Sequence, residues 1–164
     1  MDKKIWAEAM GVADELEEAL RPIGLTVRRL DGAETGDIPT VMVEREQGEG
    51  IVCNIMPARI QGVDMTFIQL YMTLTAPAPE DRRAELDRFV KGVNARFMLG
   101  NLLMFQGSVC MRYTLALDPA VPLEPDHTLI TFTAFCQQAA VYAKLGREVS
   151  SGAMTVEAAL AYRE

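Results

Sequence analysis

Apolar and polar residues alternate along several segments between Val41 and Leu117, and this period-two pattern constrains the fold more than any other feature. Successive side chains of a β-strand point to opposite faces of a sheet, so the alternation predicts strands with one buried face. In residues 108–117, "SVCMRYTLAL", Val109 and Leu115 share one face. The other segments with this pattern are residues 40–46, 50–57 and 64–75, the first two joined by a loop at 47–50. The middle of the chain is therefore predicted to be β-structure.

The stretch 97–113, "FMLGNLLMFQGSVCMRY", carries no charge before Arg112 and contains two glycines. Its apolar piece, residues 101–105, is followed by Gln106-Gly107, a candidate two-residue turn, and then by the alternating segment. A membrane helix would not alternate in this way. The stretch is predicted to be the end of a helix followed by a β-hairpin.

Apolar residues recur at intervals of three and four in the remaining segments, which predicts amphipathic helices. The predicted helices cover residues 4–20, 76–98 and 127–149, with a short closing helix at 155–164. The order is helix, three strands, helix, two strands, helix and short helix. We therefore expect an α+β fold with a five-stranded antiparallel sheet, in one domain over residues 1–164. Residues 25–30 are expected to hold at most one short extended piece.

The net charge of −7 and the pI of about 4.8 argue against nucleic-acid binding, which normally needs a basic surface. Cys53, Cys110 and Cys136 lie in apolar segments, as reduced thiols of a cytoplasmic protein do. The N-terminal residues lack the apolar core of a signal peptide. The longest run without Asp, Glu, Lys or Arg is 127–143, which contains threonines and glutamines, so no membrane span is expected. We expect a cytoplasmic location.

The order of elements over residues 3–147 resembles the type III secretion chaperone-like fold, and within it the YbjN family of bacterial sensory-transduction regulators. The local likeness is in "VNARFMLGNLLMFQGSVCMRYTLAL", with Asn94, Phe97 and Gly100 before the hairpin. A second asparagine that the family often carries is replaced here by Arg96 or Phe97. The resemblance implies helices packed on one face of the sheet, a homodimer, and a chaperone-like or regulatory role in protein binding. It brings no catalytic residues.

Two residues near the end of the second helix are predicted to have structural roles. Asn94 is expected to hydrogen-bond the following loop and to fix the turn into the hairpin. Gly100 is expected to end the helix.

Three features contain residue types found in functional sites, and each is interpreted as structural. His127, the single histidine, stands beside Asp126 in a first helical turn and is expected to be exposed, with no nucleophile motif near any serine or cysteine. Cys110 shares a strand face with Arg112 and is interpreted as a small covered residue rather than a reactive thiol. The acidic residues Asp14, Glu15, Glu17 and Glu18 are interpreted as a solvated helix face rather than a cation site. We predict no enzyme, catalytic residue, cofactor or metal site.

Apolar residues on two sides of the last helix predict that it is buried on two sides, and in so small a domain the second side often contacts another subunit. Phe135 and Tyr142 form this second stripe. Met65, Phe67 and Tyr71 lie opposite the apolar face of their strand and form the candidate surface for a partner. The first hypothesis is thus a non-catalytic, homodimeric module that binds a protein or peptide client. The alternatives are a small-ligand sensor with a pocket between sheet and helices, and a small hydrolase or isomerase using Asp or Glu.

Overall fold

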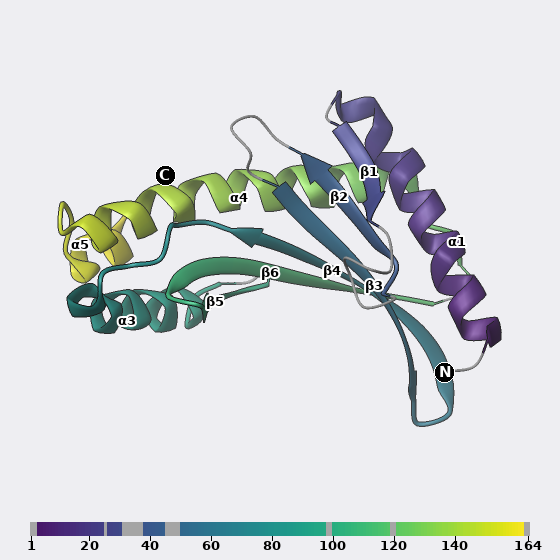
Figure 1. Cartoon of the computed structure of the whole chain (residues 1–164), viewed down its shortest axis with the longest axis horizontal. Coiled ribbons are helices and arrows are strands. Elements are labelled where there is room, and N and C mark those ends of the chain that lie inside the picture. The colour runs from purple at the N-terminus through teal and green to yellow at the C-terminus, as the bar shows by residue number, and fades with distance from the viewer. Residues whose placement is uncertain are drawn as a thin grey trace. The chain divides into compact units, whose positions relative to one another are not determined.

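The structure is a computed structural model that describes residues 3–24, 26–30, 38–44, 50–97, 100–118 and 121–162, without the side chains of 3–6 and 23. The strands are β1 (Thr26–Leu30), β2 (Thr40–Glu44), β3 (Gly50–Ile60), β4 (Val63–Thr73), β5 (Asn101–Phe105) and β6 (Ser108–Leu117). The helices are α1 (Lys3–Leu20), α3 (Arg83–Asn94), α4 (Pro125–Ser151) and α5 (Val156–Ala161), with 3₁₀ turns η1 (Arg21–Ile23) and η3 (Glu80–Arg82) (Figure 1). Parts of the predicted segments, residues 45–49, 98 and 163–164, fall outside the described residues.

The α+β class and the antiparallel sheet are confirmed, but the predicted number of five strands is wrong. Six strands of the described residues form one sheet in the order β1-β2-β3-β4-β6-β5. The additional strand is β1, which has two adjacent arginines at its centre and no clear alternation. Partners distant in sequence hold both arginines: Arg28 Nε donates to Glu44 Oε1 at 2.8 Å, and Arg29 Nη2 lies 2.5 Å from Asp14 Oδ1.

The chain divides into two compact units, each made of two stretches of sequence. Unit 1 comprises Met1–Tyr71 and Thr114–Thr133, and unit 2 comprises Met72–Tyr113 and Ala134–Glu164. The single domain expected over residues 1–164 stays a prediction.

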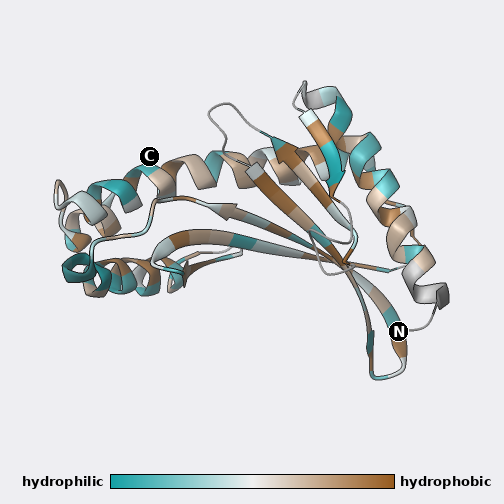
Figure 2. Ribbon diagram, viewed as in Figure 1, coloured by the Kyte–Doolittle hydropathy of each residue, from teal (hydrophilic) through white to brown (hydrophobic). Residues whose placement is uncertain are grey.

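In unit 1, α1 covers one face of β1, β2 and β3. Arg29, Val41 and Cys53 are in register on that face, and Arg29 contacts Asp14 of α1. Val41 and Cys53 are fully buried, whereas Met42, on the opposite face, is only half-buried. Figure 2 shows the apolar residues concentrated along β2 and β3, and polar residues alternating with apolar ones along α1. The core of unit 1 therefore lies between α1 and this three-stranded part of the sheet.

Two hairpins use the same two-residue turn. Gln61-Gly62 joins β3 to β4 with φ angles of 51° and 85°, and Gln106-Gly107 joins β5 to β6 with φ angles of 50° and 82°. Positive φ at both central positions is what a type I′ turn requires, and this turn matches the twist of the flanking strands. The predicted hairpin at Gln106-Gly107 is thus confirmed.

In unit 2, β6 departs from the predicted alternation in its first half. Ser108, Val109, Cys110 and Met111 are all buried, so both faces of the strand are covered there. Exposed residues reappear only at Thr114 and Ala116. The alternation alone describes one covered face, while the separate interpretation of Cys110 as a covered residue of the other face agrees with its burial.

The second helix is much shorter than predicted. It begins as a 3₁₀ turn at Glu80 and ends at Asn94 rather than at residue 98. Before it, the backbone runs beside β6, because Leu74 N–H donates to Val109 O at 2.8 Å and Ala78 N–H to Gly107 O at 2.9 Å. Residues 74–78 are therefore held along the neighbouring strand, and the helix begins only after them.

The last long helix begins two residues earlier than predicted. The carboxylate of Glu124, just before Pro125, accepts from Asp126 N–H at 3.3 Å and from His127 N–H at 2.5 Å. Glu124 therefore caps α4, and proline is tolerated at its first position because the N–H of that residue would have no partner within the helix. None of the helices within the described ranges combines the length and the apolar character that crossing a membrane requires.

Candidate functional site

A pocket of about 410 Å³ opens in unit 2 among α3, α4 and α5. The described residues that line it are Val93, Arg96, Gln138, Val141, Tyr142, Leu145, Ala159, Leu160 and Tyr162. Figure 1 shows α5 lying beside α3, next to the C-terminal part of α4. The pocket is thus formed by helices, in contrast to the sequence-based alternative that placed a pocket between sheet and helices.

Packing at Gly92 positions α5 against α3. A methyl group at Gly92 would lie 2.4 Å from Leu160 Cδ1, so the Leu160 side chain packs directly onto the glycine and would have to shift for a larger residue. Thr155 caps α5 by accepting a hydrogen bond from Ala158 N–H at 3.2 Å. Arg96 Nη1 donates to Leu160 O at 2.8 Å and holds the last turn of the helix.

An ion pair between Arg88 and Glu157 joins the two helices at the start of α5. A hydrogen bond with its own backbone and then the hydrogen bond from Arg88 hold the pKa of the Glu157 carboxyl below its ordinary value of 4.5. Both interactions favour the charged carboxylate. The pair is therefore present at neutral pH, on an exposed surface where its effect on stability is small.

Besides the two tyrosines, the pocket has two polar side chains, Arg96 and Gln138. Arg96 brings a guanidinium group, which has five N–H donors in a planar fork. Gln138 brings an amide whose Oε1 is buried and has no hydrogen-bond partner among the described residues. A buried acceptor without a donor is unusual in a folded protein and calls for a physical explanation.

Apolar and aromatic side chains form the remaining walls. Val93, Leu145 and Ala159 are buried, with exposed fractions of 3–6%. The Tyr142 ring meets the Phe97 ring edge to face, at 5.1 Å between centroids and 72° between planes. Lys144 Nζ lies 5.9 Å from the centroid of the Tyr162 ring. Among the described lining residues no Asp or Glu occurs, and Arg96 is the charged one.

The two aromatic residues predicted on the last helix have different environments. Tyr142 lines the pocket, half-buried against Phe97. Phe135 is 3% exposed and belongs to the chain's own core. Its predicted contact with a second subunit stays a prediction, and its burial leaves little of the side chain for a partner to touch.

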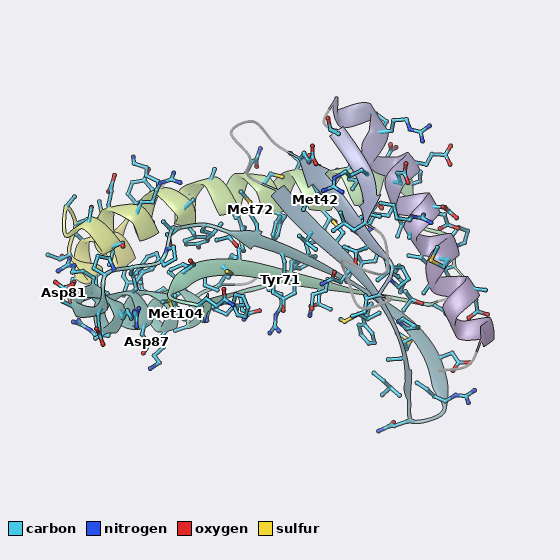
Figure 3. All side chains as sticks on the ribbon, viewed as in Figure 1. Met42, Tyr71, Met72, Asp81, Asp87 and Met104 are labelled. Carbon is cyan, nitrogen blue, oxygen red and sulfur yellow. The ribbon has the colours of Figure 1, made fainter. Side chains whose placement is uncertain are left out.

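Met65, Phe67 and Tyr71 lie on β4 in unit 1 and share one face of the strand. Each is half-buried, while Ile68 and Leu70 on the other face are 0% and 2% exposed. Figure 3 marks Tyr71 on this strand. The predicted division of the strand into a buried face and a more accessible face is therefore present, and the partner expected on the accessible face stays a prediction.

Asn94 makes the predicted hydrogen bonds beyond the helix, whereas the prediction that Gly100 ends the helix is wrong, because α3 ends at Asn94. Asn94 Nδ2 donates to Leu102 O at 2.8 Å, and Asn94 Oδ1 accepts from Leu102 N–H at 2.7 Å. Gly100 has a φ of 91°, and a methyl group there would lie 2.3 Å from Arg112 O. Although Gly100 lies beyond the end of α3, it fixes the path of the chain into β5.

The other weighed residues have local partners. Cys110 is 5% exposed, with its Sγ 3.7 Å from Thr73 Oγ1, and His127 is exposed in the first turn of α4. Asp14 pairs with Arg29, and Glu17 lies 3.9 Å from Arg21. Within the described ranges, no three His, Cys, Asp or Glu side chains are grouped as metal ligands.

A smaller cavity of about 270 Å³ in unit 1 lies between α1 and the segment that follows β6. It contains three carboxylates, from Glu8, Glu15 and Asp118. Glu15 Oε2 accepts from Leu123 N–H at 3.0 Å, and the other two are also engaged within the chain. This cavity therefore offers fewer uncommitted groups than the pocket in unit 2.

Sequence analysis missed Arg96 and Gln138 as candidate site residues. Arg96 was named only because it stands where the YbjN family often has a second asparagine. Gln138 lies in the last predicted helix, of which only the apolar residues were considered. A glutamine within an apolar helical segment is the one signal that would have pointed to a polar group inside the protein.

Comparison with protein-family models and with curated proteins finds no match for this chain.

Proposed function

We propose that this chain is a non-catalytic binding module and that the pocket among α3, α4 and α5 is its site for a small ligand. The observation that carries the proposal is Gln138 Oε1, which is buried at the pocket and has no hydrogen-bond partner in the part of the chain that the structure describes. A buried acceptor left unpaired costs about 1–3 kcal/mol. A ligand that donates to Gln138 removes this cost, so the bound state is favoured.

The size and lining of the pocket support the same function. Small-molecule sites commonly occupy about 300–1,000 Å³ and combine apolar walls with a few polar groups. This pocket has a volume of about 410 Å³, with Arg96 and Gln138 as polar groups among apolar and aromatic residues. Its lining supplies groups that bind and orient a ligand.

A thermal-shift screen of small metabolites against the full chain tests this proposal. Compounds that bind the native state raise the melting temperature by mass action. The Val141→Phe variant fills part of the pocket and is expected to lose these shifts. The control is Ile130→Phe, at a position on α4 that is 66% exposed and outside the pocket lining, which should keep them. Equal shifts in both variants would contradict the proposal.

A second candidate function is binding of a protein or peptide client as a homodimer, in a chaperone-like or regulatory role. It is favoured by an apolar hairpin tip in unit 1, where Ile60 and Val63 flank the Gln61-Gly62 turn and are 50% and 59% exposed. Met65 and Phe67 continue along the same strand as half-buried residues. The resemblance to the type III secretion chaperone-like fold, with helices on one face of the sheet, supports this role.

Light scattering during size-exclusion chromatography tests the second candidate. If a second copy of the chain covers the hairpin tip, the unmodified protein should be a dimer and the Val63→Asp variant a monomer. Val121→Asp is the matched control, because Val121 is 63% exposed and lies away from the hairpin in the sequence. If the unmodified protein elutes as a monomer at all concentrations, this dimer is ruled out.

A further inference from the structure

The geometry points to a small monocarboxylate as the ligand of the pocket, with an apolar body and one N–H or O–H donor. This inference rests on the proposed small-ligand function and specifies its chemistry. It draws on three observations: the cations at the pocket, the unpaired acceptor of Gln138, and the apolar walls.

The charge of the lining selects an anion. The chain as a whole carries a net charge of −7, yet Arg96 is the charged residue among the described lining residues and Lys144 lies beside Tyr162. Arg96 donates one guanidinium N–H to Leu160 O. A guanidinium group has five donors in all, and its planar fork matches a carboxylate. A ligand carboxylate can therefore bind Arg96 without breaking its bond to α5.

In its present orientation the Gln138 amide offers an acceptor to the ligand. Its Oε1 is buried and accepts no hydrogen bond from the described residues. A ligand that is only an acceptor, such as a simple fatty acid, would leave Gln138 unpaired. A ligand with one N–H or O–H on its apolar body satisfies Gln138 and Arg96 together.

The walls select a compact apolar body. Val93, Val141, Leu145 and Ala159 present aliphatic surface, and the Tyr142 ring is fixed in place by Phe97. Flat aromatic bodies suit such walls, because ring contacts add to the gain from buried apolar area. Indole-3-acetate combines a carboxylate, a flat apolar body and one N–H, and is therefore a suitable probe.

Titration calorimetry of the full chain with three related probes tests the inference. Indole-3-acetate should bind at millimolar concentration or tighter. Its methyl ester, which lacks the charge, and 1-methylindole-3-acetate, which lacks the N–H, should each bind about tenfold more weakly, the effect of one charge-assisted or buried hydrogen bond. If indole-3-acetate does not bind at millimolar concentration, or if the acid and the ester bind equally, the inference is overturned.

Two variants assign the preferences to individual residues. Arg96→Met should abolish the preference for acid over ester, and Gln138→Leu should abolish the preference for indole N–H over N-methyl. Each preference is the ratio of the affinities of two probes for the same variant. A general loss of stability lowers both affinities and leaves the ratio unchanged. Arg88→Met is the control for Arg96, because it removes another contact to α5 but lies outside the described lining of the pocket. It should keep both preferences.

The outcomes separate this inference from the proposed function. If the three probes fail but other metabolites shift the melting temperature in a manner lost in Val141→Phe, the pocket binds a ligand of another class and only the inference is wrong. If no compound distinguishes Val141→Phe from Ile130→Phe, the proposed function fails as well. An acid preference retained in Arg96→Met would also contradict the assignment.

Discussion

The Asn94 side chain pairs with both backbone groups of Leu102, as a neighbouring β-strand would. Its Nδ2 donates to Leu102 O at 2.8 Å, and its Oδ1 accepts from Leu102 N–H at 2.7 Å. Leu102 lies in β5, which is an edge strand of the sheet. An edge strand presents unpaired backbone groups on its outer side. Asn94, at the end of α3, thus provides hydrogen-bond partners for both backbone groups of one residue of that edge.

Replacing Asn94 by alanine should lower the free energy of unfolding by about 1–3 kcal/mol, because it leaves a backbone donor and acceptor unpaired. The urea midpoint by circular dichroism measures the loss. Asn94→Asp provides an internal comparison, since its carboxylate accepts from Leu102 N–H but faces Leu102 O without a donor. The protonated acid regains a donor, so the deficit of this variant should shrink as the pH falls below about 4. A constant deficit would contradict the role of the donated bond.

Gly100→Ala should be more destabilising than Gly24→Ala. Both glycines have positive φ, at 91° and 72°, which costs a residue with a Cβ about 1–2 kcal/mol. Only at Gly100 does the added methyl group also meet backbone, 2.3 Å from Arg112 O, whereas nothing lies within 4 Å at Gly24. Urea unfolding of the two variants measures the difference. Equal losses would show that the backbone near Gly100 adjusts freely.

Gly92→Ala and Gly11→Ala should change stability in opposite directions. Both glycines lie within helices, where alanine is intrinsically better by about 0.5–1 kcal/mol. Gly11 has no heavy atom within 4 Å of an added methyl group, so Gly11→Ala should stabilise the protein. At Gly92 the methyl group would meet Leu160 Cδ1 at 2.4 Å and crowd α5, and overpacking of this kind costs about 1–3 kcal/mol. Thermal melts of both variants test the prediction, and a more stable Gly92→Ala protein would refute it.

The Arg88–Glu157 pair should give a small, acid-sensitive contribution to stability. The folded pKa of Glu157 lies below 4.5, so the native state binds its proton less readily than the unfolded chain does. This contribution is present above pH 4.5 and is lost as the pH falls through the lower folded value. Unfolding midpoints of the unmodified protein and of Glu157→Gln should therefore converge in acid. A difference that stays the same at low pH would point to packing rather than charge.

The parts of the fold that sequence predicted well are fixed by neighbours in the chain. The turn at Gln106-Gly107 needs only two residues with positive φ, and Asn94 reaches a backbone eight residues away. The buried face of β4, with Ile68 and Leu70, follows from simple alternation. In each case the information lies within one hairpin or one loop.

The features that sequence did not predict depend on contacts between distant residues. Strand β1 has arginines at its centre, and they pair with Asp14 and Glu44, which the sequence does not place beside them. The pocket combines residues around 93–96, 138–145 and 159–162. The spacing of apolar residues along each helix does not predict that the three helices meet there.

The chain passes between the two compact units three times, once inside β4, once inside β6 and once inside α4. Neither unit is a continuous stretch of sequence, so no gene fragment can encode one of them alone. A protein truncated after Thr133 would end in the middle of α4 and would lose the rest of α4 and α5, while keeping α3 and the strands of unit 2. Truncation would therefore leave an incomplete unit beside the other one, and the roles of the two units have to be separated by point substitutions in the full-length chain.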